Sequence, residues 1–150
     1  MGIGLREFRG HIIADGSPEP PADWAQNWAI GVIDETDKKV PLWFNVTTNS
    51  EELNVHTFEL VAKERRSLVK PTTCRTWTVM GDEVSYSPES VLWYQWYLLK
   101  TGDQGNIFKD RASVENFARV KDTVEKGGHF RLVAEKKLPD GSTMTLWRQL

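Results

Sequence analysis

The segment Val91–Leu99 places the strongest constraint on the fold, because eight of its nine residues are apolar or aromatic. A helix without a polar face has to be covered by other parts of a protein on nearly every side. Ser87 and Pro88, just before this segment, are typical of a helix start, with serine as the N-cap and proline in the first turn. We therefore expect a helix over 88–101 that forms either the central helix of the domain or a contact between copies of the chain.

The length and composition of the chain favour one globular domain. Its 150 residues carry 19 basic and 21 acidic side chains, and 39% are hydrophobic. No apolar run reaches the roughly 18 residues that a membrane-spanning helix needs, so we expect no membrane association. Cys74 is the only cysteine, and the N-terminal residues do not resemble a secretory leader, which together favour the reducing cytoplasm. We expect a single domain over 1–150, with a proline-rich loop at 15–23.

Alternating apolar residues and turn residues predict most of the remaining elements. Helix 113–126 follows from an apolar stripe, and 50–66 is a third helix candidate because Thr48 and Glu51 have the spacing of a capping box. Apolar and polar residues also alternate over 53–62, so a strand remains an alternative to the helix there. These elements predict an α+β fold, with a curved, mostly antiparallel sheet of about six or seven strands, two or three helices and a C-terminal β-hairpin. The predicted strands are 5–14, 28–34 paired with 40–46, 72–80 turning at 81–82 into 83–86, and 129–137 paired with 143–150.

The sequence holds none of the common catalytic motifs. His11, His56 and His129 do not have the spacing of metal ligands. Cys74 has no neighbouring base in the sequence that would activate it as a nucleophile. The segment 103–110 offers oxygen atoms but lacks the pattern of a calcium-binding loop, and is interpreted as a turn. We therefore expect no metal, no cofactor and no catalytic residue, and an enzyme of unknown class ranks behind two binding functions.

Seven tryptophans make the chain tryptophan-rich. Trp43, Trp77 and Trp147 fall on the polar registers of three predicted strands. In one interpretation, helices cover that side of the sheet and the three indoles belong to the core. In the other, some indoles stay exposed and form a binding platform, since tryptophan offers a large, rigid contact area.

The leading hypothesis is a non-catalytic protein that recognises a partner protein or its own copy. Residues 10–37 hold six acidic side chains and no lysine or arginine, whereas 63–77 hold five basic side chains and one acidic side chain. Charged blocks of opposite sign can face each other, stay solvated or orient a partner, while apolar side chains supply affinity. The predicted partner-binding residues are Trp93, Trp96, Tyr97, Trp43 and Trp147.

The alternative hypothesis is binding of single-stranded nucleic acid. A groove that combines basic side chains with stacking aromatics is the usual design for such binding. The net charge of −2 weakens this interpretation, because phosphates need a positive surface. The predicted nucleic-acid-binding residues are Lys63, Arg65, Arg66, Lys70, Arg75 and Trp77.

Overall fold

The computed structural model describes residues 23–38, 42–73, 77–80, 83–105 and 111–150, and for 77–80, 83–86 and 111–113 it describes the backbone alone. The strand predicted over 5–14 lies outside the described residues, as does the loop predicted over 15–23 except for its last residue, Asp23. In chain order the elements are α1 (Gln26–Thr36), β1 (Leu42–Val46), α2 (Val55–Glu64), β2 (Val69–Thr73), β3 (Trp77–Met80), β4 (Glu83–Tyr86), α3 (Pro88–Val91), β5 (Trp96–Lys100), α4 (Arg111–Lys126), β6 (Phe130–Lys137) and β7 (Thr143–Gln149).

The strands form a mixed, open sheet in the order β2-β1-β5-β7-β6. β1 pairs in parallel with β2 and β5, whereas β7 pairs antiparallel with β5 and β6. Parallel strands need a crossover, and α2 and α4 supply it between β1 and β2 and between β5 and β6. The α+β class is confirmed. The mostly antiparallel sheet of about six or seven strands is not, because β3 and β4 form a separate hairpin beside the five-stranded sheet.

The predicted hairpin of 28–34 with 40–46 is wrong, because the first of these segments lies in α1. Ala29, Ile30 and Ile33 are fully buried and share one face of that helix. Their spacing of one, three and four residues is the helical pattern that packs a face against a sheet. The second segment forms β1 as expected.

The predicted helix over 88–101 is also wrong. A single helical turn, α3, is followed by β5, which is the middle strand of the sheet and has every residue buried. Trp96 and Leu98 join the core under α1 and α2, while Tyr97 and Leu99 join the core under α4. A strand covered on both faces has no polar side, which is why its sequence resembles that of a buried helix.

α2 confirms the helix predicted at 50–66, and the alternative strand at 53–62 is not formed. It begins later than predicted, because Asn54 forms the capping box: its side chain accepts the N–H of Thr57 at 3.2 Å, and its own N–H donates to Thr57 Oγ1 at 3.3 Å. The predicted strand over 72–80 corresponds to parts of two strands, β2 and β3. The other confirmed predictions are the helix at 113–126, the strand at 83–86 and the C-terminal hairpin.

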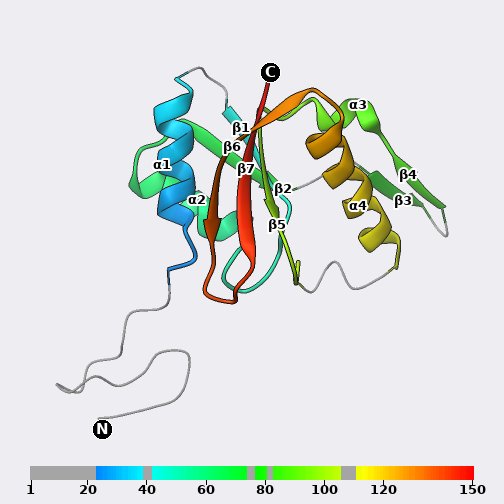
Figure 1. The fold of residues 1–150 in the computed structure, drawn as a ribbon, viewed down its shortest axis with the longest axis horizontal. Coiled ribbons are helices and arrows are strands. Elements are labelled where there is room, and N and C mark those ends of the chain that lie inside the picture. Colours follow the sequence, from blue (N-terminus) through cyan, green and yellow to red (C-terminus); the bar gives the residue numbers. More distant parts are fainter. Residues whose placement is uncertain (1–22, 39–41, 74–76, 81–82, 106–110) are drawn as a thin grey trace, which may run out of the picture.

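Helices lie on both faces of the sheet (Figure 1). α1 and α2 cover one face, and α4 covers the other over β5, β7 and β6. On the α4 side, β1 carries Trp43 and Asn45, and β2 carries Lys70 and Thr72 next to them. Trp43 stays 40% exposed, so this end of the sheet face is open to solvent.

Candidate functional site

Two exposed tryptophans flank one hollow on the surface. Trp43 and Trp93 are 40% and 66% exposed, and with Thr72 and Tyr94 they line a hollow of about 300 Å³. Of the six tryptophans whose side chains the structure describes, the other four are partly or fully buried. The indoles of Trp43 and Trp93 are therefore the ones that this surface offers to a ligand.

Hydrogen bonds fix the backbone that carries both indoles. The N–H of Trp43 donates to Gln95 Oε1 at 2.8 Å, and its carbonyl oxygen accepts from the Gln95 N–H at 3.1 Å. The Gln149 N–H donates to the Gln95 carbonyl oxygen at 2.8 Å, and Gln149 Nε2 donates to that of Leu92 at 2.9 Å. The loop that holds Trp93 is thus tied to β1 on one side and to β7 on the other.

Aromatic packing connects the hollow to the core. Tyr94 contacts Tyr97 edge to face with ring centres 5.7 Å apart, and Tyr97 contacts Phe130 in the same way at 5.2 Å. The Tyr97 hydroxyl donates to the carbonyl oxygen of Val91 at 2.8 Å. Tyr94 is therefore held from beneath, and it forms a fixed wall of the hollow.

The structure divides the predicted partner-binding residues. Trp43 and Trp93 lie at the surface, but Trp96 and Tyr97 are fully buried in the two cores and cannot contact a partner. Trp147 is half-buried against the core under α4, and its Nε1 donates to Thr145 Oγ1 at 3.0 Å. The prediction for Trp96 and Tyr97 is corrected for the same reason as helix 88–101, since both residues belong to the central strand.

Asn45 is paired in register with Thr72, which lines this hollow. It is also paired with Tyr97 of β5, and it shares the sheet face of Trp43. Its side chain is fully buried, and neither Oδ1 nor Nδ2 has a hydrogen-bond partner within the described part of the chain. Leaving a buried amide unpaired costs about 1–3 kcal/mol, so we expect the Asn45 side chain to lower the stability of the fold.

Only part of the predicted basic surface gathers at Trp43. Lys63 and Lys70 line a second hollow of about 360 Å³ together with Trp43, and Glu59 lines it too. Lys70 lies opposite Trp43 in the register of β1 and β2.

The other predicted nucleic-acid-binding residues lie elsewhere or outside the described side chains. Arg65 pairs with Asp34 at 3.6 Å, and Arg66 lines a different hollow with Asp34. The acidic and basic blocks thus meet at Arg65. Arg75 is outside the described residues, and of Trp77 the backbone alone is described, in β3.

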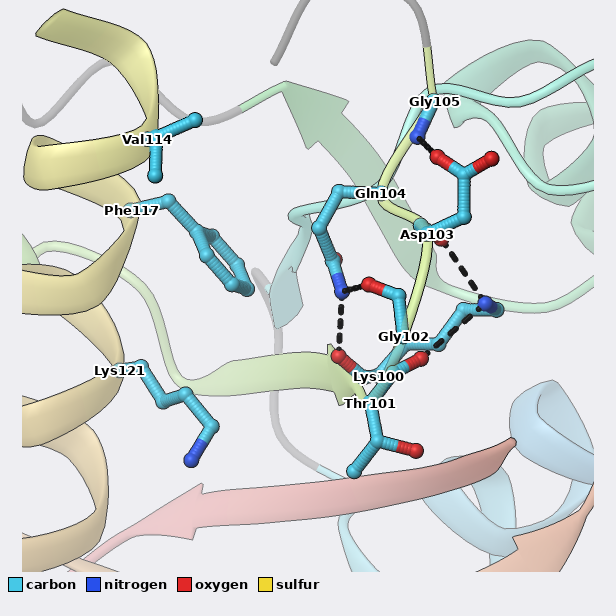
Figure 2. Close-up of a pocket in the computed structure, with 9 residues that line it drawn as sticks. All are labelled: Lys100, Thr101, Gly102, Asp103, Gln104, Gly105, Val114, Phe117 and Lys121. Atoms are coloured by element: carbon cyan, nitrogen blue, oxygen red, sulfur yellow. Dashed lines mark hydrogen bonds between the residues drawn. The ribbon is translucent and has the colours of Figure 1, made fainter. Parts of the chain in front are cut away.

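A separate cavity of about 520 Å³ lies where β5 ends (Figure 2). One wall is the face of α4 that carries Val114, Phe117 and Lys121, and the other wall is the loop 100–105. Gln104 Nε2 donates to the carbonyl oxygens of Lys100 and Gly102 at 2.6 and 2.8 Å. The sequence gives no signal for this cavity, because its two walls come from segments that only the crossover through α4 brings together.

The Lys100 ammonium is buried on the opposite side of the loop 100–105 from α4. It donates to Asp140 Oδ2 at 3.1 Å and to the carbonyl oxygen of Asp103 at 2.9 Å. Burial by itself would raise the pKa of Asp140, but hydrogen bonds from Ser142 and Lys100 and the charge of Lys100 lower it to about 2. Lys100 therefore connects β5 to the β6–β7 turn and does not point into the cavity.

The described ranges hold neither a cluster of metal ligands nor a membrane-spanning helix. No group of three or more histidine, cysteine, aspartate or glutamate side chains is arranged there to hold a metal ion. No helix in this part of the chain has the length and apolar character to cross a bilayer. Comparison of the chain with protein-family models, with curated proteins and with solved structures finds no match.

Proposed function

We propose that this chain is a non-catalytic binding protein that recognises a partner protein through Trp43 and Trp93. The observation that carries the proposal is the exposure of two indoles, 40% and 66%, around one hollow. Tryptophan is among the residues that dominate the binding energy of protein interfaces. An apolar side chain of a partner, inserted between the two rings, would remove both from water.

The rigidity of this surface supports the proposal. Gln95 and Gln149 hold the two backbone segments together, and Tyr94 is packed on the core. A surface that is ordered before binding loses little conformational entropy when a partner docks. The energy gained by covering the indoles is therefore available for affinity.

The charges near Trp43 favour a partner with an acidic residue next to its apolar anchor. Lys63 and Lys70 lie at the adjoining hollow and would attract such a residue. Glu59 lines the same hollow, and its charge disfavours a continuous polyanion. A protein segment of mixed character fits this surface better than a nucleic-acid strand.

Selection from a displayed library of random peptides, followed by calorimetry on the selected peptides, tests the proposal. We expect Trp93→Ser and Trp43→Ser each to weaken binding at least about tenfold. Leu132→Ser provides a matched control, because Leu132 is 46% exposed on the edge strand β6. Selected peptides that bind both tryptophan variants as tightly as the unsubstituted chain would contradict the proposal.

Light scattering distinguishes a second copy from a different partner. If the chain binds its own copy through this surface, its mass in solution doubles and Trp93→Ser restores the monomer. A monomer at high concentration leaves a different protein as the partner.

The second candidate is single-stranded nucleic acid, favoured by Lys63 and Lys70, which line one hollow together with Trp43. Such binding would weaken steeply with salt, because it releases counterions from the phosphates. Titration of an oligonucleotide at low and high salt tests it. Binding that is lost in Lys70→Gln and falls with salt supports this candidate, and an absence of binding at low salt excludes it.

A further inference from the structure

The hollow between Trp43 and Trp93 is lined almost entirely by aromatic side chains. Tyr94 and Thr72 complete the lining, so three of the four described residues around it are aromatic, and none is acidic or aliphatic. Trp43 belongs to β1, whereas Trp93 and Tyr94 belong to the segment between α3 and β5. The faces of an aromatic ring carry a negative potential, and several rings around one hollow are the arrangement that binds quaternary ammonium groups. The lining therefore indicates a ligand with a weakly hydrated cation.

Two of the three aromatic residues are fixed before a ligand binds. Tyr94 is buried and packs edge to face on Tyr97 with ring centres 5.7 Å apart. The backbone of Trp43 is held by hydrogen bonds with Gln95 at 2.8 and 3.1 Å. Trp93 is the most exposed of the three residues. A cation that enters the hollow thus meets rings that are largely ordered, which keeps the entropic cost of binding low.

The absence of an acidic side chain in the described lining selects the kind of cation. The ammonium of an ordinary lysine is strongly hydrated and has three N–H groups that need acceptors when water is removed. A trimethylammonium group has no N–H and is covered by methyl groups. It needs no acceptor, and its methyl groups bury apolar surface against the rings. The hollow therefore suits a fully methylated nitrogen better than an unmethylated one.

The charges next to the hollow add a second requirement. Trp43 also lines the adjoining hollow, where Lys63 and Lys70 lie. Lys70 is opposite Trp43 in the register of β1 and β2, and Thr72 lies two residues further along β2. The two lysines would repel an isolated cation, and Glu59 in the same hollow offsets the charge of only one of them. A ligand with a negative charge beside its cation avoids this repulsion and gains from both lysines.

We propose that this hollow receives a trimethyllysine side chain of the partner protein, with an acidic residue next to it that faces Lys63 and Lys70. This inference rests on the proposed function and names the anchor that the two indoles receive. Methylene and methyl groups form most of the surface of trimethyllysine, so it covers the indoles as an apolar anchor does. Binding of the partner then depends on its methylation, and this chain distinguishes the modified protein from the unmodified one.

Calorimetry with four short synthetic peptides tests the proposal. They differ only in the central side chain, which is trimethyllysine, lysine, leucine or the neutral analogue of trimethyllysine with carbon in place of the ammonium nitrogen, and each has an aspartate beside it. We expect the trimethyllysine peptide to bind with a dissociation constant below about 1 mM, and the lysine peptide at least about tenfold more weakly. The leucine peptide and the neutral analogue should bind at least about threefold more weakly. Absence of binding by the trimethyllysine peptide, or equal affinity of the neutral analogue, would overturn the proposal.

A fifth peptide tests the acidic neighbour. It keeps trimethyllysine but has asparagine in place of the aspartate, and it should bind the unsubstituted chain more weakly. Lys70→Gln should reduce the difference between these two peptides, because Lys70 is one of the two lysines that the aspartate faces. A difference that is the same in both proteins would overturn the placement of the acidic residue.

Trp93→Leu distinguishes a ring from an apolar surface. Trp93 is 66% exposed, so the fold tolerates the change, and leucine keeps an apolar side chain while removing the ring. The preference for trimethyllysine over the neutral analogue should be lost in Trp93→Leu and kept in the control Leu132→Ser. A preference that persists in Trp93→Leu would overturn this inference. Library peptides that need Trp43 and Trp93 would in that case still support the proposed function, so the two failures are distinguishable.

Discussion

Replacement of Asp140 by asparagine tests how the end of β5 is held against the β6–β7 turn. The buried ammonium of Lys100 donates to the carbonyl oxygens of Thr101 and Asp103 and, at 3.1 Å, to Asp140 Oδ2. Asp140 Oδ1 accepts the N–H of Ser142 at 2.9 Å and also its hydroxyl group. Asparagine keeps an acceptor for Ser142 but removes the negative charge opposite Lys100. Asp140→Asn should therefore lower the free energy of unfolding at neutral pH.

The expected loss follows from the pKa of Asp140, which is lowered from its ordinary 3.8 to about 2. A pKa difference of this size corresponds to a contribution of at most about 2.5 kcal/mol to the free energy of unfolding. The Asp140 side chain is 37% exposed, so solvent screens part of the interaction. We expect Asp140→Asn to cost about 1 kcal/mol.

The pH dependence identifies the charge as the cause. Because the pKa of Asp140 is lower in the folded chain than in the unfolded chain, its contribution is complete above about pH 4 and disappears as the pH falls toward 2. Urea unfolding of both proteins at several pH values between about 7 and 2.5 measures the difference. The two free energies of unfolding should converge as the solution becomes acidic.

Asp122→Asn is the control for this experiment, because Asp122 forms an exposed pair with Lys126 at 3.4 Å on α4. Exposed pairs of this kind contribute about 0.3–0.5 kcal/mol. A loss in Asp140→Asn that stays constant down to the lowest pH, or that is no larger than the loss in Asp122→Asn, would refute the reasoning.

Two further substitutions test the packing around the cavity at the end of β5 and around Asn45, with stability measured by urea unfolding. Gly105→Ala should lower the free energy of unfolding by more than about 2 kcal/mol, because Gly105 has φ +101° and the new Cβ would lie 2.1 Å from the carbonyl oxygen of Asn49. Gly141 also has a positive φ, +85°, but a Cβ there would meet no atom within 4 Å, so Gly141→Ala should lower it by about 1 kcal/mol. Equal losses would show that the close approach is not what requires glycine. Asn45→Leu should raise stability by about 1 kcal/mol because it removes an unpaired buried amide, and a loss of stability would contradict this account of Asn45.

The sequence predicted the C-terminal elements α4, β6 and β7 better than it predicted α1 and β5. The hairpin of β6 and β7 has its own turn residues, and α4 has a clear apolar stripe, so local pattern was sufficient there. Val91–Leu99 was misread because a strand buried on both faces and a buried helix have the same apolar run. α1 was misread because Ile30, Val32 and Ile33 suit a strand, although Ala29, Ile30 and Ile33 also form a helical face. Only the tertiary structure decides between these alternatives.

The candidate site was predicted only in part, again because local pattern does not reveal the tertiary structure. Alternation along β1 correctly placed Trp43 on the polar face, where it is 40% exposed. Trp93 was named with Trp96 and Tyr97 as one helical group, and the division between surface and core became visible only with β5 at the centre of the sheet. Gln95, which ties Trp93 to Trp43, carries no sequence signal, because its hydrogen bonds join segments far apart in the chain.

The central claim is that Trp43 and Trp93 act as one binding surface, and a double-mutant cycle tests it most directly. The affinity of a selected partner peptide is measured by calorimetry for the unsubstituted chain, Trp43→Ser, Trp93→Ser and the double variant. Because the two indoles border the same hollow, we predict that the single losses do not add, with a coupling of at least about 0.5 kcal/mol. Four equal affinities would contradict the claim that the partner binds here, and strictly additive losses would contradict the claim that the two indoles form a single site.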